Sequence, residues 1–220
     1  MSLIVNGLPT RGSERVLDWK STGLGFAPPY KGCRTRTQPC TLGVGHWTGG
    51  EAGTASAADD GKRVYDVLKS RDLSVHFTIG YDGTIWQYAD PAKVTCFHAG
   101  AVNNFSWGCE VVNRGLPPDQ GRNREEVAYR VHGRLVKQLA FTQAQLDSWL
   151  WLCDAVQAAL GLPRAVPAGP LEPVSERIAD LKLKALRGVV EHLNASSTKV
   201  DAGTQLLRHL LSAGYARVQP

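Results

Sequence analysis

The residues of this chain best suited to chemistry are two histidines that each lie near the end of an apolar run. His46 lies near the end of Thr41–Trp47, and His192 lies near the end of Gly188–Leu193. Apolar runs of this length are typical of buried strands, and an open α/β sheet carries its functional groups at the carboxyl ends of its strands. A lone histidine in such a place is more often a core residue with satisfied hydrogen bonds, so neither histidine by itself indicates a site.

Two further polar residues, Lys199 and Asp201, follow His192 closely in the sequence. An extended chain spans about 3.3 Å per residue, so the intervening segment is long enough to fold Asp201 back to His192. Two histidines and one carboxylate form the ligand set of a catalytic zinc ion, which keeps its fourth position open for water. His46 is the second histidine in this interpretation. The spacing is equally compatible with a surface loop in which Lys199 and Asp201 are solvated.

A carboxylate also occurs inside an apolar segment. Glu110 lies within the stretch Cys109–Val112, and glutamate is rarely buried without a partner. A glutamate aimed at a metal-activated water can accept its proton as a general base. The alternative is a structural carboxylate paired with an arginine; the strand context favours the functional role.

These residues require a sheet to position them, and the hydrophobic pattern predicts one. Asp82-Gly83 lies between alternating apolar residues, which is a strong hairpin signal, and Thr142 with Gln145 forms a capping box before a helical pattern. We expect strands at Leu3–Val5, Arg15–Trp19, Thr41–Trp47, Ser106–Asn113 and Gly188–Leu193, a hairpin over Ser74–Asp90, helices over Thr54–Arg71, Thr142–Leu160 and Thr204–Ser212, and loops at Gly23–Cys40, Arg114–Arg124 and Pro163–Pro173. The alternation predicts a single α/β domain with a central mixed β-sheet flanked by helices.

Composition limits the classes of protein that the chain can belong to. It has 220 residues with 43% hydrophobic and 20% charged residues, which excludes a disordered chain. Its net charge of +5 suits an anionic polymer as partner, but no basic stripe interleaved with aromatic residues indicates nucleic-acid binding. We expect no membrane insertion and no signal peptide, because no apolar run is long enough. The five cysteines do not form a disulfide framework, although Cys33 and Cys40 could pair.

Five segments carry a resemblance to a known family. They are GHWTGG at 45–50, LSVHFTI at 73–79 with DGTIWQ at 82–87, HAG at 98–100 with Asn103, SWGCE at 106–110, and His192 followed by Lys199 and Asp201. In this order they resemble the zinc-dependent N-acetylmuramoyl-L-alanine amidases, a family that includes phage lysozyme-type amidases and peptidoglycan recognition proteins. Trp107-Gly108-Cys109 replaces the family's usual Ile-Gly-Ile, and Ala202-Gly203 replaces its commoner Pro-Gly; neither change removes a reacting group.

The resemblance implies a role for each matched residue. His46, His192 and Asp201 would bind one Zn²⁺ per chain, Glu110 would act as the general base, and Lys199 would stabilise the oxyanion. The same resemblance implies contact with the substrate for His98, Asn103 and Trp47. Residues 1–40 would form an N-terminal extension packed on a catalytic domain that comprises residues 41–220.

The function implied is hydrolysis of the amide bond between N-acetylmuramic acid and L-alanine in bacterial peptidoglycan. Its partners would be peptidoglycan or muropeptides. The expected setting is that of a phage or prophage endolysin, synthesised in the cytoplasm without a signal peptide and acting on the cell wall after release at lysis. A cytosolic amidase that recycles muropeptides and a catalytically inactive peptidoglycan-binding module are the alternatives.

Overall fold

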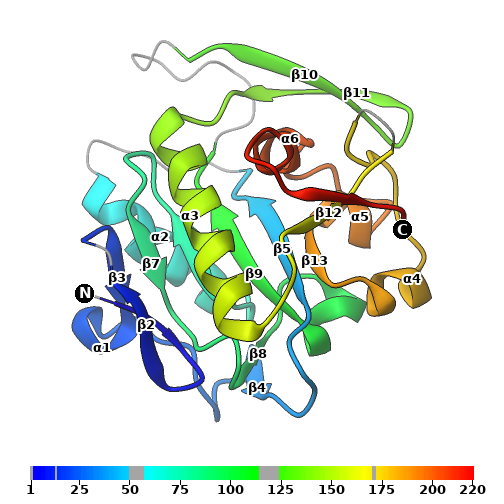
Figure 1. Cartoon of the computed structure of the whole chain (residues 1–220). Helices are drawn as coiled ribbons and strands as arrows, with labels where there is room; N and C mark the ends of the chain where they lie inside the picture. The colour runs from blue at the N-terminus through cyan, green and yellow to red at the C-terminus, as the bar shows by residue number, and fades with distance from the viewer. Residues whose placement is uncertain (1, 13, 50–56, 114–123, 170–171) are drawn as a thin grey trace.

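The computed structural model describes residues 2–12, 14–49, 57–113, 124–169 and 172–220 and is built around one six-stranded mixed sheet (Figure 1). In spatial order its strands are β13 (Gly188–Glu191), β5 (Leu42–Trp47), β9 (Ser106–Val111), β6 (Phe77–Ile79), β7 (Ile85–Gln87) and β3 (Val16–Asp18). The first four are parallel to one another, whereas β7 runs antiparallel to β6 and parallel to β3. The α/β fold with a central mixed sheet is therefore confirmed.

Helices cover both faces of this sheet (Figure 1). On one face, α3 (Gln143–Leu160) and α6 (Gln205–Ser212) enclose the main core, in which Trp149 packs against Trp107. The other face carries α2 (Ala57–Ser70), the 3₁₀ helix η1 (Gly100–Phe105), α4 (Asp180–Ala185) and α5 (His192–Ala195). The expected start of α2 at Thr54 lies outside the described residues.

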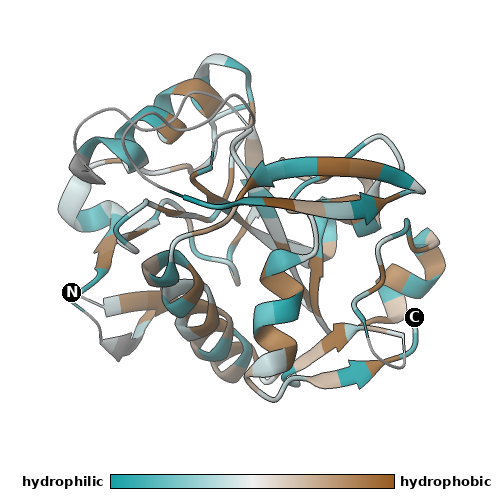
Figure 2. Cartoon of the chain, turned by 90° about the horizontal axis from the view of Figure 1, so that it is seen from above, coloured by the Kyte–Doolittle hydropathy of each residue, from teal (hydrophilic) through white to brown (hydrophobic). Residues whose placement is uncertain are grey.

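The sequence explains α3 particularly well. The Thr142 hydroxyl accepts a hydrogen bond from the Gln145 amide and the Gln145 side chain accepts one from the Thr142 amide, so the predicted capping box is confirmed. Gly161 ends the helix in the left-handed conformation that favours glycine. Figure 2 shows hydrophobic and hydrophilic residues on different sides of this helix. Among the described residues, none of the helices combines the length and the apolar character needed to cross a bilayer.

Several short elements depend on partners distant in the sequence. They are α1 (Trp19–Thr22) and the pairs β1 (Ser2–Val5) with β2 (Leu8–Gly12), β4 (Cys33–Thr35) with β8 (Val94–Cys96), β10 (Glu126–Val131) with β11 (Arg134–Leu139), and β12 (Ala165–Pro167) with β14 (Ala216–Val218). Strands β4 and β12 fall where loops were expected. Each has three residues, too few to show a hydrophobic period, and is stabilised by a distant partner.

The first forty residues contribute directly to the sheet and its core. Strand β3 pairs with β7 at the sheet edge, and Leu3 and Val5 are buried in the main core. The buried side-chain amide of Gln87 accepts a hydrogen bond from the Ile4 amide at 2.9 Å and donates one to the Ile4 carbonyl at 2.6 Å. This segment is therefore held by backbone pairing as well as by apolar contact.

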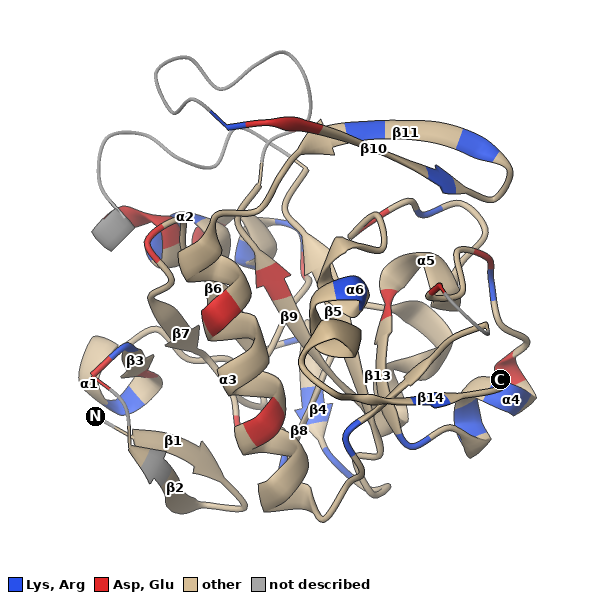
Figure 3. Cartoon of the chain, turned by 45° about the horizontal axis from the view of Figure 1, so that its top comes forward, with Lys and Arg blue, Asp and Glu red and all other residues tan. Residues whose placement is uncertain are grey.

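Lysine and arginine residues occur on the hairpin of β10 and β11 and on helix α4 (Figure 3).

The expected strand Gly188–Leu193 is shorter in the structure, because β13 ends at Glu191 and His192 begins α5. Glu191 is fully buried, and its carboxylate accepts hydrogen bonds from the backbone amides of Thr204 at 2.7 Å and Leu207 at 3.2 Å. These amides belong to the start of α6, where backbone donors have no partner within the helix. One carboxylate thus joins the end of β13 to the beginning of α6.

We predict that Glu191→Ala destabilises the fold strongly. The substitution leaves two buried amide donors without an acceptor, so the free energy of unfolding should fall by about 2–4 kcal/mol. Urea unfolding of the metal-free protein measures this loss. Glu126→Ala is the matched control, because Glu126 forms only an exposed ion pair with Lys137 and its loss should cost less than about 1 kcal/mol. Equal losses for the two variants would show that Glu191 has no special role.

Candidate active site and metal centre

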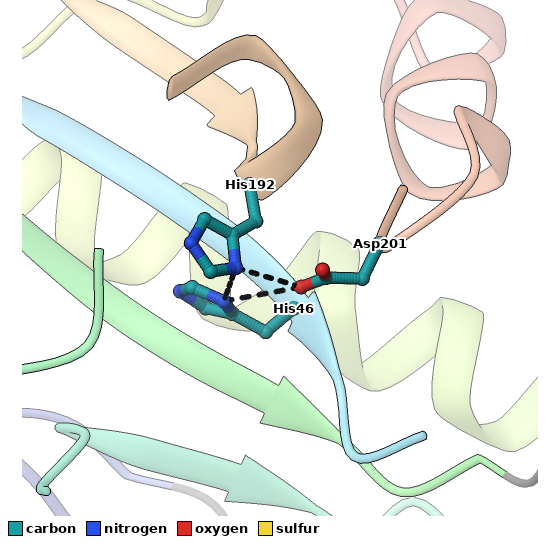
Figure 4. A group of neighbouring side chains, drawn as sticks. All are labelled: His46, His192 and Asp201. Atoms are coloured by element: carbon teal, nitrogen blue, oxygen red, sulfur yellow. Dashed lines mark hydrogen bonds and ion pairs between the residues drawn. The ribbon is translucent and has the colours of Figure 1, made fainter. Parts of the chain in front are cut away.

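Three predicted ligand residues converge at the carboxyl ends of two neighbouring strands (Figure 4). His46 lies near the end of β5, and His192 directly follows β13, which is the parallel neighbour of β5. Asp201 comes from the turn that precedes α6, and its carboxylate reaches the two imidazole rings. All three residues are buried, with at most 8% of their surface exposed. The register of two parallel strands therefore brings together residues that are far apart in the sequence.

The ligand atoms form a nearly equilateral triangle. Nδ1 of His46 lies 3.0 Å from Nδ1 of His192, and Oδ2 of Asp201 lies 3.3 Å and 3.0 Å from these nitrogens. A tetrahedral zinc ion with ligand distances of about 2.05 Å would separate its ligand atoms by about 3.3 Å. The observed set therefore matches the size and donor chemistry of a zinc site with three protein ligands.

The protonation states of two of these groups also suit a cation. Burial and the neighbouring His192 lower the pKa of His46 to about 4, so its imidazole is neutral near pH 7 and has a lone pair to donate. Burial alone would raise the pKa of Asp201, but hydrogen bonds with His192 and His46 outweigh it and lower the pKa below its usual value. A neutral imidazole and an ionised carboxylate are the forms in which these residues bind metals.

A third histidine, His98, contacts the back of the His46 ring. Nε2 of His46 lies 2.9 Å from Nδ1 of His98, and Nε2 of His98 lies 3.2 Å from the Ser106 hydroxyl. A proton on Nε2 of His46 would leave Nδ1 of the same ring free for a metal ion, which is how partners of ligand histidines commonly select the tautomer. Gly108 makes room for this contact, because a Cβ atom there would lie 2.5 Å from the His98 ring.

Glu110 lies beside the triangle without a partner of its own. Glu110 lies on β9 and is the register partner of His46 on the neighbouring parallel strand β5, so the two side chains share a face of the sheet. Its Oε2 atom is buried and has no hydrogen-bond partner among the described residues. Burial and the charge of Asp201 raise its pKa to about 8, which Lys199 and Arg71 counteract. An ion pair with arginine, the structural alternative, does not occur within the part of the chain that the structure describes.

A pocket of about 470 Å³ opens beside these residues. Lys199 lies on its rim, and His98, Asn103 and His192 also line it. The Lys199 ammonium lies close enough to lower the pKa values of both His46 and Glu110. The positive charge of Lys199 therefore acts on both groups from the wall of a cavity that also borders His192.

The residues expected to contact substrate differ in their surroundings. Asn103 accepts hydrogen bonds from the backbone amides of His98 and Ala99 at 3.1 Å and 2.7 Å, so it holds the pocket wall that it lines. Trp47 packs against the main core on the other face of the sheet, because successive side chains of a strand point to opposite faces. The structure therefore brings His98 and Asn103, but not Trp47, to the pocket that contains His192.

One residue near the site was missed by the sequence analysis. His132 lies at the tip of the hairpin between β10 and β11, and its ring nitrogens lie 3.0 Å from the Lys199 carbonyl oxygen and 3.1 Å from a Glu176 carboxylate oxygen. The sequence does contain a hairpin pattern here, because alternating residues precede a His-Gly pair that suits a tight turn. The hairpin thus supports the backbone of the segment that carries Lys199.

Comparison with known proteins identifies the same fold. The structure resembles Drosophila peptidoglycan recognition protein SD, with a TM-score of 0.55 and 15% identity over 88% of this chain and 91% of that one. It also resembles a human peptidoglycan recognition protein in complex with glycosamyl muramyl pentapeptide, with a TM-score of 0.53 and 15% identity over 92% and 98%. A variant of Drosophila peptidoglycan recognition protein LB in complex with tracheal cytotoxin gives a TM-score of 0.53 and 16% identity over 93% and 97%.

The sequence comparisons concern the family rather than the fold. No curated protein matches the chain. The family model of N-acetylmuramoyl-L-alanine amidase, however, matches residues 36–204, which include all the residues of the triangle, Glu110 and Lys199. The chain therefore belongs to the N-acetylmuramoyl-L-alanine amidase family.

Proposed function

We propose that the protein is a zinc-dependent amidase that hydrolyses the bond between N-acetylmuramic acid and L-alanine in peptidoglycan. The observation that carries this proposal is the triangle of His46, His192 and Asp201 beside the unpartnered carboxylate of Glu110. A binding module without activity would have no need of a carboxylate oxygen that is buried without a hydrogen bond, since such an atom costs stability. Active sites commonly contain groups of this kind.

The reaction assigns a separate task to each residue. A zinc ion held by His46, His192 and Asp201 would supply Lewis-acid polarisation of the amide carbonyl and a lower pKa for water. Glu110 would take the proton of the attacking water and deliver it to the leaving amine of L-alanine. The Lys199 ammonium would stabilise the negative charge that develops on the carbonyl oxygen. The pocket of about 470 Å³ that His98, Asn103, His192 and Lys199 line is the proposed place for the substrate.

The substrate class rests on the family and on the ligands of proteins with the same fold. Two of the similar structures contain glycosamyl muramyl pentapeptide or tracheal cytotoxin. We propose further that the protein acts on intact cell wall in the manner of an endolysin, because its net charge of +5 and its basic surface segments suit an anionic envelope (Figure 3). Recycling of soluble muropeptides is the competing role.

We predict about one zinc ion per chain in the purified protein. Removal of a group that is hydrogen-bonded to a metal ligand typically lowers metal affinity by roughly 10–100-fold. Removal of a ligand itself should cost more, so we expect a larger loss of zinc affinity in each of His46→Ala, His192→Ala and Asp201→Ala. Elemental analysis and chelator competition measure this. His209→Ala, which removes a half-buried histidine of α6 that does not belong to the triangle, should retain the metal. Full zinc content in His46→Ala would remove this residue from the ligand set.

We predict that Glu110→Gln abolishes most of the activity while it keeps the metal. The amide is nearly isosteric but accepts protons poorly, so cleavage should fall by roughly 10²-fold or more. Mass analysis of the products from intact sacculi and from soluble anhydro-muropeptides identifies the bond and the preferred substrate. Release of peptides that begin with L-alanine supports the proposed bond. A wild-type protein that binds sacculi and zinc without releasing peptide would instead be a binding module.

We predict that Lys199→Met lowers kcat, by roughly 10²-fold, without loss of zinc. It should also move the acidic limb of the pH–activity profile to higher pH. A general base works when ionised, so activity falls as the pH drops through its pKa, and removal of the Lys199 charge raises the pKa of Glu110. Lys62→Met, on the exposed side of α2, is the control. An unshifted acidic limb would mean that Lys199 does not interact with the base.

A further inference from the structure

Two of the five cysteines face each other across the small sheet of β4 and β8. Cys33 and Cys96 are register partners in this antiparallel pair. Two other register pairs of this ladder form backbone hydrogen bonds. The Phe97 amide donates to the Gly32 carbonyl at 3.2 Å, and the Arg36 amide donates to the Lys93 carbonyl at 2.8 Å. Hydrogen-bonded and non-hydrogen-bonded pairs alternate along an antiparallel ladder, so Cys33 and Cys96 occupy a non-hydrogen-bonded position. The hydrogen bond of the Cys33 amide is consistent with this position, because the amide donates to the Tyr30 carbonyl and not to Cys96.

This position suits a disulfide bond. Non-hydrogen-bonded partners have Cα atoms about 4.5 Å apart and side chains on the same face, and disulfides occur at Cα separations of about 4.4–6.8 Å. Both cysteines are buried and belong to the same hydrophobic cluster beneath α2. The Cys33 thiol is near enough to contribute to the raised pKa of Cys96. Register, face and environment therefore place the two cysteines side by side.

The other possible partner of Cys33 is less well placed. Cys40 lies seven residues further on, but it packs in the main core with Trp107 and Trp149. Cys33 packs in the separate cluster that contains Phe26 and Tyr65. A bond between Cys33 and Cys40 would require one of them to leave its cluster, whereas a bond between Cys33 and Cys96 would not.

We propose that Cys33 and Cys96 are a reversible disulfide-forming pair, a covalent modification site that does not depend on the proposed amidase activity. All five cysteines are free thiols in the structure, which represents the reduced form. A small-molecule disulfide such as oxidised glutathione serves as the oxidant. The thiolate of one cysteine attacks it and releases one thiol, and the second cysteine then attacks the mixed disulfide and releases another. Two protein thiols thereby lose two electrons and two protons, and the oxidant becomes two thiols.

The location gives the bond a structural consequence. Strand β8 continues through Phe97 into His98, which contacts the ring of His46. The Arg36 guanidinium, beyond the end of β4, donates to the carbonyls of Asn104 and Ser106 and so holds the other end of the same wall. A covalent link between β4 and β8 would therefore fasten both supports of the pocket wall together without altering a residue of the triangle.

Refolding in a glutathione redox buffer tests the proposal, because every thiol is accessible in the unfolded chain. The refolded protein is alkylated, digested and mapped by mass spectrometry. We expect a Cys33–Cys96 bond with the other three cysteines alkylated, and a melting temperature higher than that of the reduced protein by about 5–15 °C. The bond should persist in Cys40→Ala.

Cys33→Ala and Cys96→Ala should each yield protein without this bond and without the rise in melting temperature on oxidation. Five alkylated cysteines in the wild type, or a bond between Cys33 and Cys40, would overturn the proposal. If one of the two alanine variants fails to fold, the wild type and Cys40→Ala still decide it, since the map identifies the bonded pair directly. Activity against sacculi is a separate measurement, so failure of the proposed function would leave this result intact.

Discussion

The constraint on which the site depends is the parallel register of β13, β5 and β9. This register places His46 beside Glu110 on neighbouring strands, and it brings the end of β13, where His192 follows, to the same edge of the sheet. Parallel strands need crossover connections, and here these connections carry other parts of the site. The crossover from β5 to β9 contains His98, whereas the segment that leaves β13 for α6 contains Asp201. A shift of one residue in either pairing would turn a ligand or the base to the opposite face.

The register alone would not fix the ring and loop conformations, and a second set of contacts does so. His98 holds the outer nitrogen of His46, and the buried carboxylate of Glu191 holds the backbone at the start of α6. His132 holds the Lys199 carbonyl from the hairpin side. Ordering the ligand side chains costs free energy, which lowers the affinity for the metal unless the fold has already ordered them. The first contact orients the His46 ring on β5, and the other two hold the backbone of the segment between His192 and α6.

The sequence allowed prediction of the residues of the triangle, but not of these supports. The apolar runs before His46 and His192, and the family motifs, identified residues whose chemistry is recognisable from type and spacing. The hairpin of β10 and β11 makes its contacts with residues far away in the sequence, so no local pattern could indicate that His132 meets Lys199. The same limit explains the short strands in the expected loops. The family resemblance implies contact with the substrate for Trp47, whereas strand alternation directs its side chain to the main core.

The two carboxylates of the site show how one fold prepares the same functional group for different tasks. Asp201 shares its oxygen with two imidazoles, which stabilise the ionised form and lower its pKa. The Oε2 atom of Glu110 is buried without such a partner among the described residues, and the pKa of this group rises to about 8. A carboxylate with a low pKa binds a cation well but accepts protons poorly, whereas one with a raised pKa is a better base near neutral pH. A cation in the triangle would lower the pKa of Glu110 from this value and so increase the ionised fraction that can take a proton. The opposite shifts of the two groups thus follow from their neighbours, and they suit Asp201 to the proposed role of ligand and Glu110 to the proposed role of base.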